Sequence, residues 1–393
     1  MAILAVNAGS STLKFSVHPL QAGQVQPPIL SGSIEGLEPG GQPEMGWELN
    51  AQRQRRALPH STDNPFGQAL DSLHQLLTEE LTLPLTAVSH RVVHGGQAFR
   101  SSVIVTPDIL TALERLNSLA PLHQPHNLAG IRAFRKAFAE LPQVACFDTA
   151  FHATLPALEY TFALPQALSD EGVRRYGFHG LSYQSVMGTL QQVTPRAHGR
   201  TLMAHLGNGA SLCAAVHGQS VATTMGFSAL DGLMMGSRCG AIDPGVLLYL
   251  LEQGWSHDRI ETLLYRQSGL LGVSGVAADM RTLRADTTPS AQFAIELFTH
   301  RIVRNAGALT ASMSGIDLLA FSGGIGENDA VLRSQVCQKL AYLGVRMDEA
   351  RNRPGGQPAA RPIHAADSTV EVWVVPTDEG QVVASEAAAL IRG

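Results

Sequence analysis

The feature that most constrains the fold of this chain is a strand-and-turn pattern that occurs three times. In each case a short apolar run ends in a tight turn of glycine and small polar residues. The runs and turns are Ile3–Val6 with Asn7–Ser11, Leu202–Leu206 with Gly207–Ser211, and Leu318–Phe321 with Ser322–Asn328. A strand that ends in small residues exposes backbone N–H groups, and concave backbone turns of this kind bind phosphate. Their repetition in both halves of the chain indicates a duplicated fold that holds phosphate between its copies.

The bulk composition indicates two domains with a large buried interior. Of the 393 residues, 45% are hydrophobic and 16% charged, and a chain of this length normally divides into two domains. The net charge of −5 argues against nucleic-acid partners, which require a basic face. The N-terminal stretch lacks the pattern of a secretory leader, and no apolar run approaches membrane-spanning length. We therefore expect a soluble cytoplasmic protein with no membrane partner.

The cysteines predict neither a disulfide framework nor a zinc site. Cys146, Cys213, Cys239 and Cys337 are far apart in the sequence and form no CxxC pair. We expect them to be reduced residues of the interior.

Hydrophobic periodicity predicts two successive α/β domains. The first part is expected to contain strands at 2–6, 13–18, 87–93 and 143–147, a β-meander through 20–62, and helices at 66–80, 107–119 and 127–138. In the second part we expect strands at 201–206, 212–217, 317–321 and 370–375, and helices at 245–253, 257–266, 291–313 and 330–343. A last helix at 381–391 is able to cross back to the first part. The predicted domains are residues 1–150 with 381–393, and residues 151–380, closely joined with a cleft between them.

The first turn carries the groups that a phosphate site needs. Between Asn7 and Lys14 the chain offers an amide, hydroxyl groups and a cation, which together position and neutralise phosphate oxygens. The sequence contains no GxxxxGK[ST] P-loop, and Gly207-Asn208-Gly209 lacks the third glycine of a dinucleotide fingerprint. Taken singly, each turn is better interpreted as an ordinary hairpin loop. The three matching turns together favour nucleotide binding.

Two arginines in glycine-bounded segments are candidates for binding an anion. Arg91 lies in His90–Gly96, and Arg238 lies in Met234–Gly240. An arginine among apolar and glycine neighbours requires an anionic partner, although an ordinary surface arginine remains the alternative. The pairs His90/His94 and His123/His126 lack the HExxH pattern of a helical metal site, which favours structural or hydrogen-bonding roles.

Two carboxylates follow predicted strands, where ligands bind in α/β folds. Asp148 follows the strand at 143–147 and Glu379 follows the last strand. Such groups suit Mg²⁺, which combines a few hard oxygen ligands with substrate phosphates, although a helix cap or a surface acid is the alternative for each. His179 stands close to glycines on both sides, so its ring can approach a substrate. The GxSxG nucleophile elbow and the HRD and DFG kinase signatures are absent.

These segments together resemble the acetate/propionate kinase family of short-chain acyl kinases, over nearly the full length of the chain. The matching segments are Asn7–Ser11 with Lys14, His90–Gly96, Phe147–His152, Arg175–Gly180, His205–Gly209, Met235–Arg238 and Gly324–Asn328. The resemblance implies an α/β fold of two ribonuclease-H-like domains in the actin-like and sugar-kinase-like superfold. It further implies an N-terminal acyl-kinase domain, a C-terminal nucleotide-binding domain, and a homodimer.

The resemblance also implies a reaction and a role for each matching residue. The reaction is reversible transfer of the ATP γ-phosphate to acetate, giving acetyl phosphate and ADP, with Mg²⁺ or alternatively Mn²⁺. The implied catalytic residues are Asp148, Arg91, Arg238, His179 and His123, and the implied metal ligands are Asn7, Asp148 and Glu379. Substrate would contact Arg91, Val93, Leu122 and Phe178. Nucleotide would contact Lys14, His205, Asn208, Gly209, Asp279, Arg281, Gly324, Ile325, Gly326 and Asn328.

The chain departs from the family pattern at four positions. Ala229 stands where a proline is frequent, Ala241 where an aspartate is common, Gly380 where a second glutamate follows Glu379, and Met280 where an aromatic residue is frequent. These departures bear on acyl and nucleotide preference. A propionate- or butyrate-preferring kinase is therefore the alternative within the family, and an actin-type ATP-binding switch is the alternative outside it.

Overall fold

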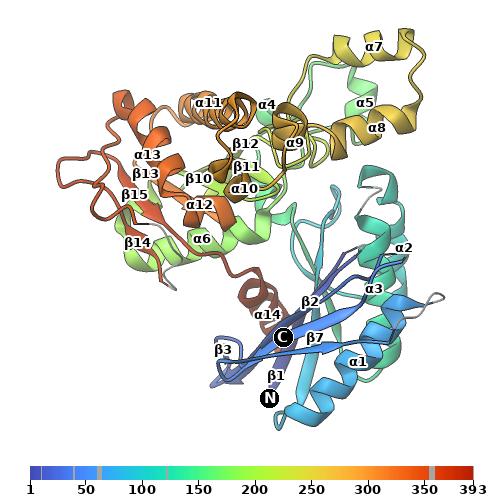
Figure 1. The fold of residues 1–393 in the computed structure, drawn as a ribbon. Coiled ribbons are helices and arrows are strands. Elements are labelled where there is room, and N and C mark those ends of the chain that lie inside the picture. The colour runs from blue at the N-terminus through green and yellow to red at the C-terminus, as the bar shows by residue number, and fades with distance from the viewer. Residues whose placement is uncertain (10, 39, 60–63, 121–122, 354–358, 393) are drawn as a thin grey trace. The chain divides into compact units, whose positions relative to one another are not determined.

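The chain folds into two compact units. The computed structural model describes residues 1–393 except 10, 39, 60–63, 121–122, 354–358 and 393. Unit 1 consists of Met1–Ala150 and Asp378–Gly393, and unit 2 consists of Phe151–Thr377 (Figure 1). The second crossing lies at Asp378 and not at the expected residue 381. Asp378 accepts a hydrogen bond from the backbone N–H of Gln381 and so begins the final helix, which packs within unit 1.

Unit 1 is built on one mixed sheet with helices on its two faces. The strands are β1 (Ala2–Ala8), β2 (Leu13–Gln21), β3 (Gln24–Val25), β4 (Leu30–Glu35), β5 (Glu44–Leu49), β6 (Gln52–Ala57), β7 (Leu85–Val92), β8 (Val103–Ile104) and β9 (Gln143–Phe147). Their order is β6-β5-β4-β2-β1-β7-β9-β8, with β3 beside β2. The helices are α1 (Pro65–Glu80), α2 (Pro107–Glu114), α3 (Gln124–Ala137) and α14 (Glu379–Leu390), with a 3₁₀ turn at Asn117–Leu119.

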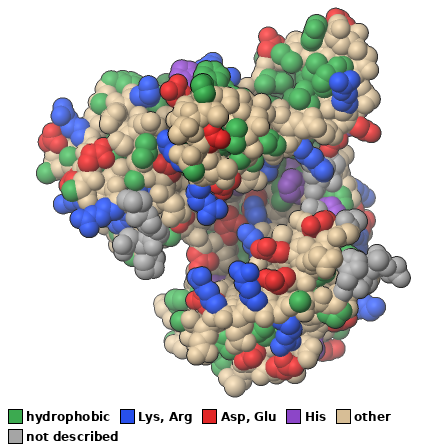
Figure 2. Space-filling view, in the orientation of Figure 1, with side chains coloured by type: hydrophobic (Ala, Val, Ile, Leu, Met, Phe, Trp, Pro, Cys, Tyr) green, Lys and Arg blue, Asp and Glu red, His purple; other side chains and the backbone are tan. Residues whose placement is uncertain are grey.

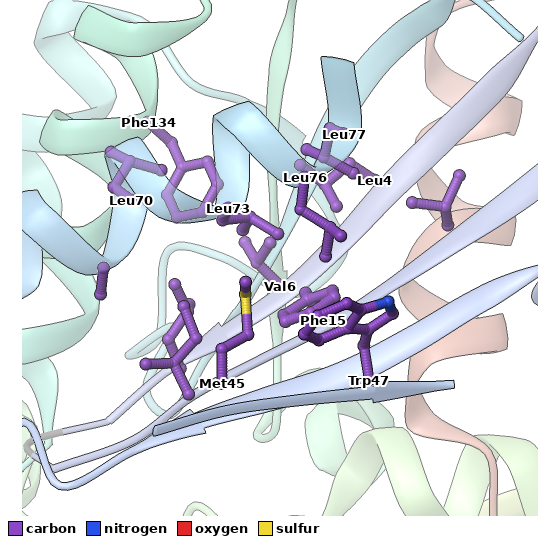
Figure 3. Close-up of a cluster of buried hydrophobic side chains, with 14 of the residues drawn as sticks. Leu4, Val6, Phe15, Met45, Trp47, Leu70, Leu73, Leu76, Leu77 and Phe134 are labelled. Carbon is purple, nitrogen blue, oxygen red and sulfur yellow. The ribbon is translucent and has the colours of Figure 1, made fainter. Parts of the chain in front are cut away.

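The core of unit 1 lies between one face of the sheet and α1 (Figure 3). Alternate residues of β1 and β2, among them Leu4, Val6 and Phe15, point toward the leucines that recur every three or four residues along α1. Leu73 and Leu76 are fully buried there. The opposite face of the sheet is left for α14, which packs against β1 and β7.

Unit 2 has a second mixed sheet. Its strands are β10 (Arg200–Leu206), β11 (Ala210–Val216), β12 (Gln219–Thr223), β13 (Leu318–Ser322), β14 (Arg361–Pro362) and β15 (Glu371–Val374), in the order β12-β11-β10-β13-β15-β14. The longer helices are α6 (Gly180–Val193), α7 (Pro244–Glu252), α8 (His257–Arg266), α11 (Pro289–Ser312) and α13 (Ala330–Lys339). The shorter ones are α4 (Ala157–Tyr160), α5 (Gln166–Asp170), α9 (Gly269–Ser274), α10 (Met280–Ala285) and α12 (Gly323–Asn328), with 3₁₀ turns at Ala150–Thr154, Pro195–His198 and Ala341–Leu343.

The two sheets repeat one arrangement of strands. In unit 1, β4, β2 and β1 are antiparallel neighbours, and β7 and β9 follow β1 in parallel. In unit 2, β12, β11 and β10 are antiparallel, and β13 and β15 follow β10 in parallel. The matching turns of the sequence therefore follow corresponding strands, β1 in unit 1 and β10 in unit 2. The predicted duplication is present in the structure.

The third predicted turn is a short helix and not an open loop. Residues Gly323–Asn328 form α12 directly after β13. The Glu327 carboxylate accepts from the backbone N–H of Gly323, and the guanidinium of Arg333 donates to the carbonyls of Gly326 and Glu327. These contacts satisfy backbone groups that the ends of a short helix leave unpaired. Gly323 itself has φ +74° and lies against the backbone of Leu206, so a side chain there would be strained.

An ion pair at the start of β10 predicts an acid-sensitive contribution to stability. The Arg200 side chain hydrogen-bonds Asp317 and lowers the pKa of its carboxyl to about 2, against a smaller opposing effect of burial. Because the folded pKa is below the unfolded one, the stabilisation is complete above about pH 4 and is lost as pH falls toward 2. We expect Asp317→Asn to lower the free energy of unfolding by about 1 kcal/mol at neutral pH, a value reduced for solvent exposure. Urea midpoints of both proteins should converge as pH falls below about 4; a gap that does not narrow would contradict this role.

Candidate active site

One face of the unit 1 sheet gathers the predicted catalytic groups of that unit. Val6 of β1 pairs with His90 of β7, so Asn7 lies beside Arg91, and Arg91 in turn pairs with Cys146 of β9. The Cys146 thiol contacts the carbonyl of Val383 in α14, which identifies this as the α14 face. Side chains alternate along a strand, so Asp148, two residues after Cys146, continues the same row.

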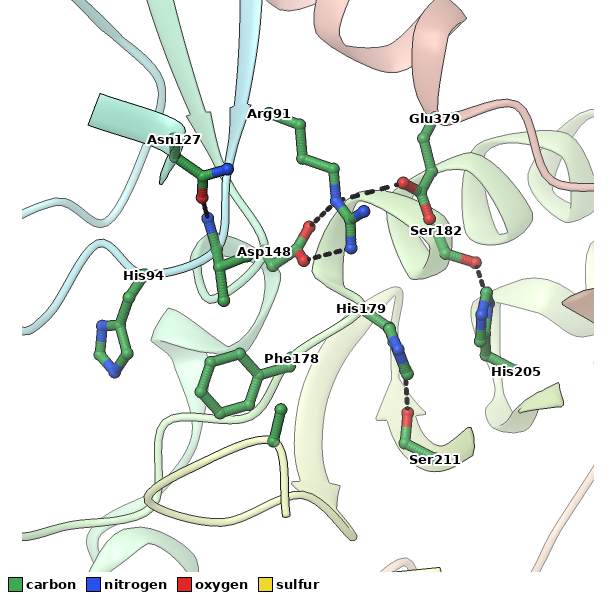
Figure 4. A network of polar contacts seen from close by, with 12 residues as sticks. Arg91, His94, Asn127, Asp148, Phe178, His179, Ser182, His205, Ser211 and Glu379 are labelled. Atoms are coloured by element: carbon green, nitrogen blue, oxygen red, sulfur yellow. Dashed lines mark hydrogen bonds and ion pairs between the residues drawn. The ribbon is translucent and has the colours of Figure 1, made fainter. Parts of the chain in front are cut away.

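Arg91 forms the centre of this group (Figure 4). Its Nε donates to Oδ1 of Asp148 over 3.1 Å and its Nη2 to Oδ2 over 2.7 Å, a bidentate pair. Nε also lies 3.3 Å from a carboxylate oxygen of Glu379, the first residue of α14. Burial by itself lowers the pKa of Arg91, but the charges of Asp148 and Glu379 outweigh it and raise the pKa. The guanidinium is therefore permanently charged.

Asp148 is the most deeply placed carboxylate of the group. Its side chain is 3% exposed, compared with 26% for that of Glu379. Burial raises the pKa of Asp148, and the neighbouring Arg91 acts in the opposite direction. One guanidinium thus faces two carboxylates, so negative charge exceeds positive charge in the cluster. The amide of Asn7 on the adjacent strand adds a further hard oxygen donor. These are the donor atoms that Mg²⁺ prefers.

Two buried amides of α3 hold the backbone around this cluster, and the sequence reasoning did not identify them. Asn127 accepts from the N–H of Val93 over 3.0 Å and donates to the carbonyl of Ala8 over 2.7 Å, so it links the ends of β1 and β7. Gln124 bonds both the N–H and the carbonyl of His94. Their signal in the sequence was their position among apolar residues of an amphipathic helix, where a polar group must find a partner.

The remaining predicted residues of unit 1 lie around this edge of the sheet. Lys14 is the exposed cross-strand partner of Asn7, which places both on the same face. His123 is the residue that precedes α3, and Val93 follows the end of β7 and is partly buried. Leu122 lies outside the described residues. Gly380 departs from the family pattern, and a side chain at this position would be crowded, because its Cβ would lie 2.7 Å from the Ser16 hydroxyl.

In unit 2, two histidine rings lie stacked at the start of α6 (Figure 4). The ring centroids of His179 and His205 are 4.3 Å apart. Nδ1 of His179 is 2.8 Å from the Ser211 hydroxyl, and Nδ1 of His205 is 2.7 Å from the Ser182 hydroxyl. His179 itself has left-handed backbone geometry, with φ 59°. A non-glycine residue in this region costs on the order of 1–3 kcal/mol and is typical of functional sites.

Arg238 faces the same point as His179. A Cβ built on Gly209 would lie 3.1 Å from Nε2 of His179 and 3.9 Å from Nη2 of Arg238, so both groups border the small turn after β10. Nη1 of Arg238 donates to the carbonyl of Ala229 over 2.9 Å. In the segment that follows β12, the guanidinium of Arg175 donates to three successive carbonyls from Thr223 to Met225. Two arginines thus hold the backbone of this segment, and Arg175 is a further residue that sequence reasoning gave no role.

Two of the predicted nucleotide residues of unit 2, Asn208 and Asp279, lie near one another around Gly236. The N–H of Gly236 donates to the carbonyl of Asn208 over 3.0 Å, and a Cβ on Gly236 would lie 3.1 Å from the carbonyl of Ala278, next to Asp279. Asp279 accepts from the N–H of Thr282 and so begins α10. The full set that the sequence predicts for the nucleotide in unit 2 is His205, Asn208, Gly209, Asp279, Arg281, Gly324, Ile325, Gly326 and Asn328. Arg281 is highly exposed and pairs with Asp279 at 3.3 Å.

Phe178 and His152 are buried neighbours in unit 2. Phe178 is 2% exposed, and its carbonyl accepts a hydrogen bond from Nε2 of the buried His152 over 2.9 Å. Burial lowers the pKa of His152 to about 4, so this imidazole is neutral at physiological pH.

None of the helices among the described residues combines the length and apolar character needed to cross a bilayer.

Comparison with known proteins gives a family match along almost the whole chain. Residues 2–385 match the model of the acetokinase family. The chain belongs to this family. An acetate kinase of Rhodopseudomonas palustris (strain ATCC BAA-98 / CGA009) is 47% identical over 400 residues, which cover 100% of this chain and 98% of that protein. Acetokinases use ATP, and the predicted family and nucleotide are therefore confirmed.

Solved acetokinase structures share the whole fold. The acetate kinase of Porphyromonas gingivalis matches with a TM-score of 0.89 and 33% identity, covering 99% of both chains. A propionate kinase from Francisella tularensis matches with a TM-score of 0.90 and 35% identity, covering 98% of both chains. The predicted α/β fold with two similar domains is confirmed, and it is the fold of solved acetate and propionate kinases.

Proposed function

We propose that this acetokinase transfers the γ-phosphate of ATP reversibly to acetate, giving acetyl phosphate and ADP. The observation that carries the proposal is the Arg91–Asp148–Glu379 cluster, in a chain that matches the family along almost its whole length. A carboxylate is ionised at neutral pH and requires no general base. Its oxygen attacks the γ-phosphorus directly and in line, the bond from this phosphorus to the bridging oxygen breaks, and that oxygen leaves with ADP.

The unit 1 cluster fits the task of holding a divalent cation and the acyl carboxylate. Asp148 and Glu379, with Asn7, supply oxygen donors suited to Mg²⁺, which neutralises phosphate charge when bound; Mn²⁺ is the alternative. Arg91 would bind the carboxylate of the acyl substrate, with Val93 against its alkyl group and His123 assisting. We accordingly infer that unit 1 is the acyl-kinase domain, with Lys14 reaching the phosphates.

The groups of unit 2 fit the task of binding ATP and the transferring phosphoryl group. Arg238 and Nε2 of His179 face one point beside Gly209, where two donors would stabilise charge on equatorial phosphoryl oxygens. His205, Asn208, Gly209, Asp279, Arg281 and α12 would hold the rest of the nucleotide. We infer that unit 2 is the nucleotide-binding domain and that phosphoryl transfer relies on positioning and charge neutralisation.

A second candidate within the family is a preference for propionate or butyrate. The observation that favours it is Ala229, at a position where a proline is frequent and whose carbonyl holds Arg238. The smaller side chain of alanine would leave more room for the alkyl group of a longer acid. A panel of acetate, propionate and butyrate would rank the acids by kcat/KM.

The proposed activity is tested by trapping the product. Purified protein is incubated with ATP, Mg²⁺ and each acid in turn, and hydroxylamine converts any acyl phosphate to a coloured hydroxamate. We expect hydroxamate with acetate at rates that depend on the cation. Absence of product with every acid would refute the proposal.

We also propose a homodimer, supported by the surface of α7 (Figure 2). No residue of this apolar helix is buried within the chain, and Leu248, Tyr249 and Leu251 are each more than half exposed. An exposed apolar patch of this kind is typical of a protein–protein interface.

The reduced cysteines and the use of ATP support a cytoplasmic location.

The dimer proposal predicts the effect of a charge on α7. Leu248→Glu should convert the protein to a monomer in sedimentation velocity, because a desolvated carboxylate costs several kcal/mol at an apolar interface. Leu158→Glu is the matched control, since Leu158 is 97% exposed on α4 and lies outside the α7 surface. A wild-type monomer, or a dimer that survives Leu248→Glu, would exclude α7 as the interface.

A further inference from the structure

Two contacts between a histidine and a serine join the first turn of α6 to the strand pair β10–β11. His179, Ser182 and Tyr183 lie at the start of α6, spaced so that they share one face of the helix. His205 of β10 and Ser211 of β11 are cross-strand partners. Each side thus contributes one imidazole and one serine hydroxyl, and each hydroxyl contacts Nδ1 of the opposite imidazole. Both contacts are short, at 2.8 Å and 2.7 Å.

A third group extends the contact between His179 and Ser211. The Tyr183 hydroxyl lies 2.5 Å from the Ser211 hydroxyl. Tyr183 is fully buried, and burial raises its pKa well above its ordinary value of 10.0, so the phenol keeps its proton. A buried hydroxyl proton needs an acceptor, and the contact that the described residues give the Tyr183 hydroxyl is the Ser211 oxygen, so Tyr183 donates to Ser211.

The direction of the chain of hydrogen bonds then follows from a count of protons. When Tyr183 donates to the Ser211 oxygen, the described residues offer the serine's own proton one acceptor, Nδ1 of His179. A neutral imidazole that accepts at Nδ1 carries its proton on Nε2. Nε2 is the atom that faces Gly209 and Arg238.

We propose that Ser211 and Tyr183 are positioning residues that fix His179 as the Nε2–H tautomer. In that form a neutral imidazole presents a hydrogen-bond donor to the phosphoryl oxygens beside Arg238 and adds no second charge. The opposite tautomer would turn a lone pair toward the same oxygens and repel them. The catalytic part of this inference rests on the proposed phosphoryl transfer, whereas the tautomer itself does not.

The His179 tautomer is measured by NMR without any substrate. Two-bond and three-bond ¹H–¹⁵N correlations distinguish Nε2–H from Nδ1–H imidazoles, and the His179 signals among the 15 histidines are assigned by their loss in His179→Gln. At about pH 8, where an unperturbed imidazole is neutral, we expect the Nε2–H pattern in the wild-type protein. We expect Ser211→Ala to populate the Nδ1–H form and Ser211→Thr to restore the wild-type pattern, because threonine retains the hydroxyl.

Kinetics of the same variants separate positioning from a general structural role. We expect Ser211→Ala to lower kcat about tenfold, which is the effect of one misdirected hydrogen bond. The KM values for ATP and acetate should change by less than about threefold. Tyr183→Phe should have a smaller effect in the same direction. Ser182→Ala is the matched control, because it removes the equivalent contact to His205 and should leave the His179 tautomer unchanged.

The outcomes separate this proposal from the proposed function. An Nδ1–H pattern in the wild-type protein, or a His179 tautomer unchanged by Ser211→Ala, would overturn the positioning role whatever the activity. An Nε2–H pattern that depends on Ser211 in a protein that forms no acyl phosphate would support the hydrogen-bond chain and refute the proposed reaction. Thermal midpoints of each variant verify that the chain is folded.

Discussion

Replacing Arg91 by alanine should lower kcat by about a thousandfold or more, because it removes the charge that we propose to bind the acyl carboxylate. The bidentate contact to Asp148 and the 3.3 Å contact to Glu379 show that this guanidinium is held in a fixed position. Steady-state rates of hydroxamate formation give the comparison. Arg91→Lys, which keeps the charge but loses the bidentate geometry, should recover only a small part of the loss.

The same substitution should also destabilise unit 1, and this separates it from a purely catalytic change. Asp148 is almost fully buried, and removal of its partner leaves an uncompensated charge at a cost of about 3–5 kcal/mol. The double variant Arg91→Ala/Asp148→Asn should regain part of the stability, measured by urea unfolding, without regaining activity. An Arg91→Ala protein with more than half of the wild-type kcat would contradict the assigned role.

Replacing Arg238 by alanine should produce a comparable loss of kcat with a much smaller loss of stability. Nη1 of Arg238 donates to the neutral carbonyl of Ala229, and losing such a bond costs about 0.5–1.5 kcal/mol. Its Nη2 and Nε2 of His179 both border Gly209, where charge develops on the phosphoryl oxygens in the proposed reaction. We expect kcat to fall by at least about a hundredfold, with the thermal midpoint within a few degrees of wild type.

Arg266 provides the matched control for this second substitution. It is exposed in the last turn of α8, in the same unit as Arg238. Arg266→Ala should leave the rates of hydroxamate formation unchanged. If Arg238→Ala retained full activity, or if Arg266→Ala lost as much as Arg238→Ala, the role of Arg238 at the phosphoryl group would be wrong.

Local sequence patterns predicted most of the fold. The turn after Val6 and the turn after Leu206 follow corresponding strands of two repeated sheets, as their shared pattern indicated. The helix predicted at 107–119 ends at Glu114 and continues as a 3₁₀ turn, and the glycine-rich segment after β13 is helical. In the second case the contacts that stabilise the helix come from Arg333, which a local pattern could not reveal.

The site was less predictable, because its geometry depends on contacts between distant residues. Arg91 and Asp148 were each identified as candidates, but their pairing across 57 residues follows from the register of β7 and β9. Asn127 was predicted only as part of a helix, although its amide links the ends of two strands. Tyr183 and Ser211 gave no signal of their own, since a buried tyrosine and a strand serine are common core residues.

Transfer of phosphate to acetate is observed directly when the protein is incubated with ATP and Mg²⁺, with and without acetate, and the phosphorus signals are followed by ³¹P NMR. We predict that acetyl phosphate and ADP accumulate in equal amounts when acetate is present, and that ATP remains intact when it is absent. Release of inorganic phosphate at the same rate with and without acetate would identify an ATP hydrolase of the actin type and contradict the assignment of this chain as a carboxylate phosphotransferase.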